Sequence, residues 1–311
     1  MKLEKFGIYR FSRDNTTINF YTGFQTYDTF LAFYRCIEPT AQNMQSAYYQ
    51  SSEVISLAGR KRNMLLLDKL FMFLCRLHMG LLEQDLSIRF KCSVLTVSRK
   101  IVTWANFLYF FLGTIPIWLT KTQIQDLMPE CFKSTYPNTR VIIDCTEIKT
   151  QHPFSLVLNS QLYSNYKGTN AFKYLIGIAP HGAVTFVSSL YTGCISDVEI
   201  TKLSYLLDLL EAGDDVMADK GFTLRKILSE RYVTLNIPLF LSEIRETMQI
   251  ARLRKHVERI NKRIKENDLF DSAIPMSLAG SINQLWTVVC LLANFKRPLV
   301  HSWSKQQSQD I

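Results

Sequence analysis

The chain has 311 residues, of which 47% are apolar and 20% are charged. This balance excludes a disordered protein and suits a core domain of roughly 150 residues with smaller units beside it. Lysine and arginine outnumber acidic residues by 36 to 27, which gives a formal net charge of +9. A basic surplus favours polyanionic partners such as nucleic acid, although charge alone is weak support for DNA binding.

The chain shows no sign of secretion or of membrane insertion. Its seven cysteines are scattered without a Cys-x-x-Cys pair, which indicates buried, reduced thiols in a reducing compartment. Residues 1–60 are aromatic and polar without strong periodicity, so we treat them as a poorly defined leader, and we find no secretory signal there. The apolar stretch 101–119 contains polar residues and a proline, which favours a buried helix ending at Gly113 over a membrane span.

Residues 61–113 carry the pattern of a helix-turn-helix. Apolar residues recur at helical spacing from Leu67 to Gly80, a second helix is expected over 81–90, and a turn at 91–93 leads into a long third helix. The polar, basic start of that helix would meet the major groove of DNA. The residues expected at this contact are Arg89, Lys91, Thr96, Arg99 and Lys100. A structural three-helix bundle explains the apolar spacing equally well.

The remainder predicts a mixed α/β domain. Residues 114–140 hold three prolines and are expected to form a linker with one short helix. The elements expected after it are strands over 141–148, 173–179, 183–190, 216–219 and 233–237, and helices over 197–210, 246–265 and 282–295. Their order is that of the ribonuclease H-like fold, a mixed sheet with helices on both faces, here over 141–298 before a polar tail at 299–311.

Acidic residues recur along this predicted domain. Cleavage of phosphodiesters by two metal ions needs oxygen ligands that converge on ions roughly 4 Å apart, and Mg²⁺ prefers such ligands. Asp144 and Asp219 fall on strands that are neighbours in this fold, so their side chains can meet. Each has a plain alternative, because Asp144 could pair with a lysine and Asp219 could form a turn before Gly221.

Glu258 lies on the basic helix. At about 100° per residue, Arg254, Glu258 and Lys265 fall within about 40° of one another. An apolar stripe beside this row would pack on the sheet, and it consists of Ile250, Leu253, Val257, Ile260 and Ile264. We therefore expect Asp144, Asp219 and Glu258 to be catalytic metal ligands, although a solvated Arg–Glu pair would give the same spacing.

Asp197 is expected to be an auxiliary metal ligand, with an equally good structural explanation. Ser196 to Glu199 fits a capping box, in which an aspartate of the first turn is also favoured by the helix dipole. Glu147 is a weaker candidate, because it would point to the strand face opposite Asp144. The basic side chains Arg254, Lys262 and Lys265 could hold DNA phosphates, or could form a solvated charged face.

Several segments together resemble eukaryotic DDE-superfamily endonucleases, the relatives of Harbinger-type and bacterial insertion-sequence transposases. They include Val-Ile-Ile-Asp-Cys-Thr-Glu (141–147), Ser-Asp-Val-Glu-Ile-Thr (196–201), Val-Met-Ala-Asp-Lys-Gly-Phe (216–222) and His-Val-Glu-Arg-Ile-Asn-Lys-Arg-Ile-Lys (256–265). The resemblance implies a ribonuclease H-like domain behind a helix-turn-helix, with metal ligands at Asp144, Asp197, Asp219 and Glu258.

The resemblance has departures. Arg254, Glu258 and Lys265 are similar to the Tyr-Arg-Glu-Lys pattern of insertion-sequence enzymes, but Ala251 stands where that pattern has its tyrosine. Gly168-Thr169 replaces the usual histidines, and the zinc-binding THAP module of many relatives is missing from this sequence. The missing module bears on recognition of transposon ends more than on cleavage.

The first expectation is thus a DNA endonuclease or transposase in the nucleus. It would use two Mg²⁺ or Mn²⁺ ions for in-line phosphoryl transfer, cleaving and joining strands of transposon ends and target DNA. A homo-oligomer or a DNA-binding partner protein is possible, and no membrane partner is expected. The alternative is a domesticated DNA-binding or adaptor protein whose DDE fold is catalytically silent.

Overall fold

The described part of the chain forms two compact units. In this computed structural model it consists of residues 6–44, 64–219, 221–237 and 258–296. The helical unit comprises the described parts of 1–115 together with 265–272 and 277–296. The sheet-containing unit comprises the described parts of 116–264 together with 273–276.

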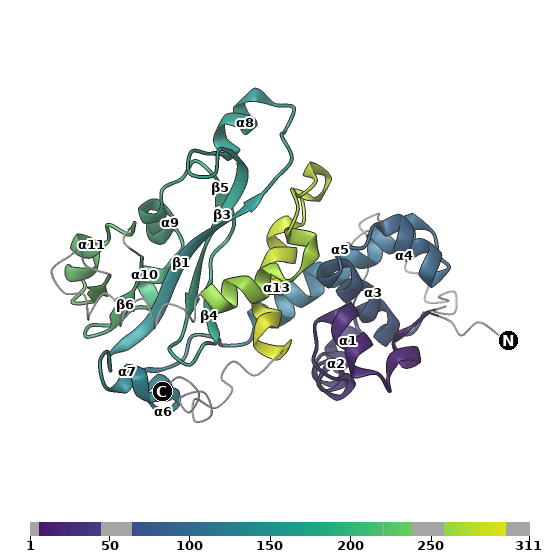
Figure 1. The fold of residues 1–311 in the computed structure, drawn as a ribbon, viewed down its shortest axis with the longest axis horizontal. Helices are drawn as coiled ribbons and strands as arrows, with labels where there is room; N and C mark the ends of the chain where they lie inside the picture. Colours follow the sequence, from purple (N-terminus) through teal and green to yellow (C-terminus); the bar gives the residue numbers. More distant parts are fainter. Residues whose placement is uncertain (1–5, 45–63, 220, 238–257, 297–311) are drawn as a thin grey trace, which may run out of the picture. The chain divides into compact units, whose positions relative to one another are not determined.

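The helical unit begins with helices that the sequence prediction missed. Its elements are η1 (Ile8–Phe11), α1 (Asn15–Thr22), α2 (Tyr27–Ala41), α3 (Leu66–His78), α4 (Glu83–Phe90), α5 (Val94–Gly113), η2 (Asp268–Phe270) and α13 (Ile282–Lys296) (Figure 1). Asp14 caps α1 by accepting hydrogen bonds from the amides of Thr16 and Thr17, and Thr26 forms a capping box with Thr29 on α2. These caps are sequence signals for helices in a region that we expected to be a leader.

The helix-turn-helix agrees with its sequence pattern. The apolar residues predicted to line one face of α3 are buried, namely Leu67, Leu70, Phe71, Leu74 and Leu77. Gly80 adopts a positive φ of 62°, and Arg76 donates hydrogen bonds to the carbonyls of Gly80 and Leu81, at 3.1 and 2.8 Å. These bonds fix the turn between α3 and α4. The third helix ends at Gly113, as predicted.

Two further expectations concern the chain as a whole. No helix in the described ranges has the length and apolar character needed to cross a membrane. All seven cysteines lie in these ranges and are free, as expected, but Cys36 and Cys194 are exposed rather than buried. The last helix, α13, packs on α2 and α5 of the helical unit, although its sequence position falls in the predicted sheet domain. Its apolar residues lie on most sides, so periodicity does not show which unit covers it.

The second unit has the mixed sheet of the ribonuclease H-like fold. Its strands are β1 (Thr139–Lys149), β2 (Tyr163–Ser164), β3 (Thr169–Ile178), β4 (Val184–Val187), β5 (Tyr191–Thr192), β6 (Asp215–Met217) and β7 (Thr234–Asn236). The path through the sheet is β2-β3-β1-β6-β7, and β4 and β5 also pair with β3. β1 is antiparallel to β3 and parallel to β6. The predicted adjacency of these two strands is therefore confirmed, but β6 ends at Met217, so Asp219 lies two residues beyond the strand on which we expected it.

The helices of this unit differ from the prediction in detail. They are α6 (Lys121–Leu127), α7 (Glu130–Lys133), α8 (Leu156–Leu162), α9 (Asp197–Leu203), α10 (Leu206–Leu209) and α11 (Arg225–Ser229), and η3 (Met276–Leu278) follows later in the chain. The helix expected over 197–210 is broken at Tyr205, whose φ is +63°. The predicted linker contains two short helices instead of one. Of the basic helix, residues 258–265 are helical and 246–257 lie outside the described residues.

The two faces of β1 have different neighbours. Val141 and Ile143 belong to an apolar core with buried residues of α9, α10, α11, β6 and β7. Cys145 is half-buried and packs against this same core. Because successive side chains of a strand alternate between faces, Asp144 and Thr146 point to the opposite face. The sheet therefore separates the environment of Asp144 from the core beneath Cys145.

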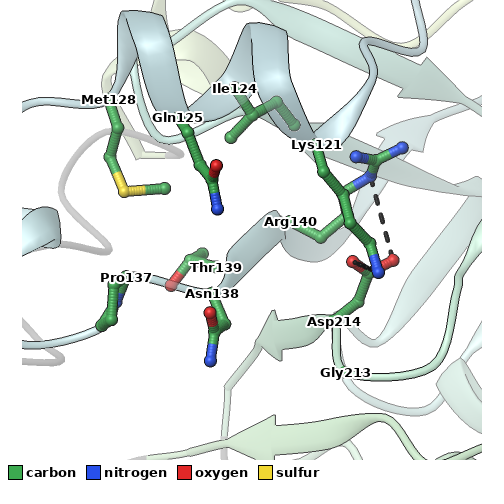
Figure 2. A pocket seen from close by; sticks show the side chains of 10 residues that line it. All are labelled: Lys121, Ile124, Gln125, Met128, Pro137, Asn138, Thr139, Arg140, Gly213 and Asp214. Atoms are coloured by element: carbon green, nitrogen blue, oxygen red, sulfur yellow. Dashed lines mark ion pairs between the residues drawn. The ribbon is translucent and has the colours of Figure 1, made fainter.

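A charged cluster joins the start of β1 to α6 (Figure 2). The side chain of Arg140 is 3% exposed, and its Nε lies 3.9 Å from the carboxylate of Asp214, which is 2% exposed. Lys121 of α6 lies 3.3 Å from the same carboxylate and donates a hydrogen bond to the carbonyl of Ala212. The guanidinium of Arg140 also stacks over the ring of Trp118 at 5.1 Å. The exposed Glu211 lies 3.7 Å from Arg140 and 3.5 Å from Lys121, so Asp214 is the buried member of two acids that share these cations.

We predict that Asp214→Ala lowers the free energy of unfolding by about 3 kcal/mol, because the buried Arg140 is left with only the exposed Glu211 as an acidic partner. Asp208→Ala is the matched control, since Asp208 forms an exposed ion pair with Arg231 at 3.2 Å. Its loss is expected to cost no more than about 1 kcal/mol. Urea unfolding measures both variants, and equal losses would contradict the role of Asp214.

Candidate active site

A hydrogen bond between side chains joins β1 to the helical residues 258–265. Asn261 is 8% exposed, and its side-chain amide donates a hydrogen bond of 2.7 Å to Oδ2 of Asp144. The hydroxyl of Thr146 donates to the same oxygen at 3.2 Å. Ile260 and Ile264, two members of the predicted apolar stripe, are buried as expected, whereas the other three lie outside the described residues. The helix is therefore packed on its apolar side and held at Asp144 by an amide.

Glu258 lies one helical turn before this contact. Three residues correspond to about 4.5 Å along a helix axis, and side chains at this spacing are neighbours on the helix surface. Glu258 is exposed, so its carboxylate is open to water near the amide that contacts Asp144. The apolar stripe predicted that this helix packs on the sheet, and the structure places the helix on the face that carries Asp144.

Asp219 continues the register that aligns β6 with β1. Ile142 pairs with Met217, and both Asp144 and Asp219 lie two residues further along their parallel chains. Ala218, the residue after β6, packs in the core on the opposite face, so an alternation continued past the strand would direct Asp219 to the face of Asp144. Asp219 is exposed, and its carbonyl accepts a hydrogen bond from the amide of Phe222. Asp219 therefore begins a turn, which is the alternative role that we considered for it.

Asp197 occupies the other face of β1. It is the first residue of α9, and Ser196 caps the helix by accepting a hydrogen bond from the amide of Glu199. Its carboxylate lies 2.6 Å from the ammonium of Lys173 on β3, and the two side chains are 28% and 14% exposed. Lys173 also donates to the carbonyl of Ile195 at 3.2 Å. The structure thus places Asp197 against a lysine, on the face where Cys145 packs.

Cys145 shows the electrostatic character of this face. Burial raises the pKa of its thiol, and the negative charge and hydrogen bond of Asp197 raise it further. Glu147, on the same side of β1, accepts a hydrogen bond of 2.8 Å from the hydroxyl of Ser164. It points away from the face of Asp144, as predicted. Both influences favour the protonated form of the thiol.

The expected phosphate-binding residues are only partly described. Lys262 and Lys265 are exposed, whereas Arg254 lies outside the described residues. Within the described ranges, no three His, Cys, Asp or Glu side chains gather closely enough to hold a metal ion. The three predicted metal ligands, Asp144, Asp219 and Glu258, are all carboxylates, and the last two are exposed. Such oxygen donors fit Mg²⁺ or Mn²⁺ rather than a softer metal.

In the helix-turn-helix, the predicted DNA contacts have different surroundings. Lys91 is exposed with a positive φ of 52° at the end of α4, and Arg99 is exposed on α5. Thr96 is half-buried and is bonded through its amide to Ser93, the cap of α5. Burial lowers the pKa of Lys100. Arg89 is held at 2.6 Å by Asp85 and lies over the ring of Phe6, so its guanidinium is already engaged within the unit.

Comparisons with known proteins agree with this arrangement. A family described as "DDE superfamily endonuclease" matches residues 143–294, and one described as "Helix-turn-helix of DDE superfamily endonuclease" matches residues 62–113. A search among curated proteins found no match. The two matched regions coincide with the helix-turn-helix and with the ribonuclease H-like sheet that follows it in the chain. The chain belongs to the DDE superfamily endonucleases.

Sequence reasoning missed two residues of this site. Asn261 lies among charged residues of an amphipathic helix, where a side-chain amide does not indicate a functional role. The available signal was its position one helical turn after Glu258. Lys173 was noticed only as the start of a predicted strand. Its register partner across β1 is Glu147, so the strand pairing alone would have suggested a different ion pair from the one with Asp197.

We predict that Lys173→Met destabilises the protein by about 2 kcal/mol, because a half-buried carboxylate loses its charged partner. If Asp197 is an auxiliary ligand, Mg²⁺ takes the place of the ammonium and raises the melting temperature of the variant more than that of the wild type. The control is Lys202→Met, which removes an exposed pair with Glu199 at 3.7 Å on the same helix. Thermal unfolding with and without Mg²⁺ reports both effects. A variant that loses stability but gains nothing from Mg²⁺ would assign Asp197 a purely structural role.

Proposed function

We propose that this DDE superfamily endonuclease is an active, metal-dependent DNA nuclease of the transposase type. In this proposal Asp144, Asp219 and Glu258 bind two divalent ions, either Mg²⁺ or Mn²⁺. Phosphodiester bonds are cleaved at these ions. The observation that supports it best is the hydrogen bond from Asn261 to Asp144. It ties the helix of Glu258 to the strand that carries the first aspartate, on the face to which register directs Asp219.

Each residue has a distinct part in the proposed reaction. Bound divalent ions would activate a water molecule, or the 3′-hydroxyl of a cleaved DNA strand, and would balance the charge on the phosphoryl group during in-line displacement. Asn261 and Thr146 both donate to Oδ2 of Asp144 and so hold its carboxylate in one orientation. The exposed lysines Lys262 and Lys265, with Arg254, would position the DNA backbone through its phosphates.

Asp197 has a different place in the proposal. In this structure Asp197 anchors the start of α9 to the sheet through its ion pair with Lys173. To act as an auxiliary ligand, Asp197 would have to leave Lys173 and bind a metal ion instead. We keep it as an auxiliary residue and assign the chemistry to the other three carboxylates.

The proposed substrate is double-stranded DNA, both the transposon ends and a target. The exposed residues Lys91 and Arg99 would meet DNA from the helix-turn-helix, with Thr96 and Lys100 nearby and Arg89 contributing less because Asp85 holds it. A Harbinger-type element, action in the nucleus, and assembly as a homo-oligomer or with a DNA-binding partner complete the proposal.

The experiment is nicking of supercoiled plasmid with Mg²⁺, compared among Asp144→Asn, Asp219→Asn and Glu258→Gln. Each variant removes a ligand whose ion contributes several kcal/mol to the transition state, so we predict a rate loss of about a thousandfold. DNA binding with the metal chelated is expected to persist. The control is Asp126→Asn, an exposed acid on α6 of the same unit, which should nick like the wild type.

Unchanged nicking by all three variants would contradict the assignment. A wild-type protein that binds DNA and yet nicks under no divalent ion would instead support the rival function, an adaptor with a silent DDE fold. Both activities are measured on one preparation, so the two outcomes cannot be confused with misfolding.

A further inference from the structure

The loop between β1 and β3 presents large apolar side chains to solvent. Phe154, Leu156 and Val157 are 108%, 85% and 68% exposed, and Tyr166 is 87% exposed. We call residues 151–168, which include α8 and β2, the β1–β3 tip. In Figure 1 α8 stands at one end of the long strands β1 and β3, with α6 and α7 at the other end. So many exposed apolar side chains in one short segment mark an interaction surface.

The tip is a folded element that presents these side chains in a fixed way. The side-chain amide of Asn170, which is fully buried, donates to Oδ1 of Asn159 on α8 at 2.8 Å. Leu162 is fully buried, and a Cβ at Gly193 would overlap its carbonyl, so β5 packs closely beneath the end of α8. The exposed apolar residues are thus those left over after α8 has covered the sheet.

The charge of the tip favours one class of partner. No aspartate or glutamate occurs between Glu147 and Asp197 in the sequence. The exposed basic side chains in or next to the tip are Lys149, His152 and Lys167, and the ammonium of Lys167 lies 5.5 Å from the centre of the Tyr166 ring. The acid in contact with the tip is Glu147, which is half-buried and bonded to Ser164. Exposed aromatic side chains interleaved with cations fit the bases and phosphates of nucleic acid.

The strand that carries Asp144 also leads to the tip. From Asp144 to Lys149 the chain is continuous β1, five residues at about 3.3 Å each, or roughly 17 Å. This length corresponds to about five base pairs of B-DNA at 3.4 Å each. DNA held at Asp144 and running along the strand would therefore arrive at the tip within half a helical turn.

We propose that the β1–β3 tip is a second DNA contact, which packs Phe154, Leu156, Val157 and Tyr166 against unstacked bases a few base pairs from the cleaved bond. Lys149, His152 and Lys167 face the adjoining phosphates. Apolar side chains gain most where bases are already unpaired, since they replace lost stacking. This inference rests on the proposed function for its position along DNA. It adds a preference for distorted DNA that the metal-binding residues alone do not provide.

The test compares the full-length wild type with the triple variant Phe154→Ala, Leu156→Ala, Val157→Ala, and with Tyr166→Ala. All four side chains are exposed, so the variants should fold. The probes are a fluorescent duplex and the same duplex with a short unpaired bubble containing 2-aminopurine, both with the metal chelated. The control is Leu127→Ala, which removes an apolar side chain on α6 that is 55% exposed, far along β1 from the tip.

We expect the wild type to bind the bubble more tightly than the duplex and to change the 2-aminopurine fluorescence. Loss of one stacked base corresponds to roughly a tenfold loss of affinity for the bubble in the triple variant, with a smaller loss for the duplex. The Leu127 variant should match the wild type. Equal affinities and equal fluorescence for the wild type and both tip variants would overturn the proposal.

Analytical ultracentrifugation of the same proteins tests whether a second copy of this chain occupies the tip instead of DNA. If the tip variants change self-association while their DNA binding stays that of the wild type, the surface pairs copies of this chain and the proposal is overturned. Because binding is measured with the metal chelated, failure of the tip contact is distinguishable from failure of the proposed nuclease, which appears only in the nicking assay.

Discussion

The hydrogen bond between Asn261 and Asp144, at 2.7 Å, is the contact on which the site depends. It joins a strand near the middle of the chain to a helix more than a hundred residues later, and the buried Ile260 and Ile264 hold that helix in place. An amide donor is well suited to this position, because it orients a carboxylate without neutralising it as an arginine or lysine would. In our proposal this oriented carboxylate is the one that binds a divalent ion. The nearby Glu258 gains its position from the same contact.

Because side chains alternate along β1, the acidic residues of this domain lie in two different environments. One face carries Asp144 and its contact with Asn261, and in our proposal also Asp219 and Glu258, whereas the other face holds the apolar core, Cys145 and the Lys173–Asp197 pair. Like charges packed together repel, so carboxylates on one face require a cation or solvent between them. On the opposite face a lysine already supplies that charge to Asp197. The fold thereby gives two aspartates of similar sequence context different partners.

The sequence predicted the features that depend on local pattern. β-rich runs and the turn at Pro180 to Gly182 identified the strands, and their order implied that Asp144 and Asp219 lie on neighbouring strands. Contacts between distant side chains left no such pattern, so neither Asn261 beside Asp144 nor Lys173 beside Asp197 was foreseen. Helices α1 and α2 could have been found from their caps at Asp14 and Thr26, but their aromatic composition hid the helical period. Tyr205 breaks a predicted helix through a positive φ that its residue type does not signal.

The central claim is that three carboxylates from distant segments bind the same ions. Fe²⁺ in place of Mg²⁺, with ascorbate and peroxide, produces hydroxyl radicals at the bound ion that cut the nearby polypeptide backbone. The account predicts fragments that end close to residues 144, 219 and 258, all suppressed together by excess Mg²⁺. Cuts at only one of these segments, or cuts that Mg²⁺ does not suppress, would contradict a shared site.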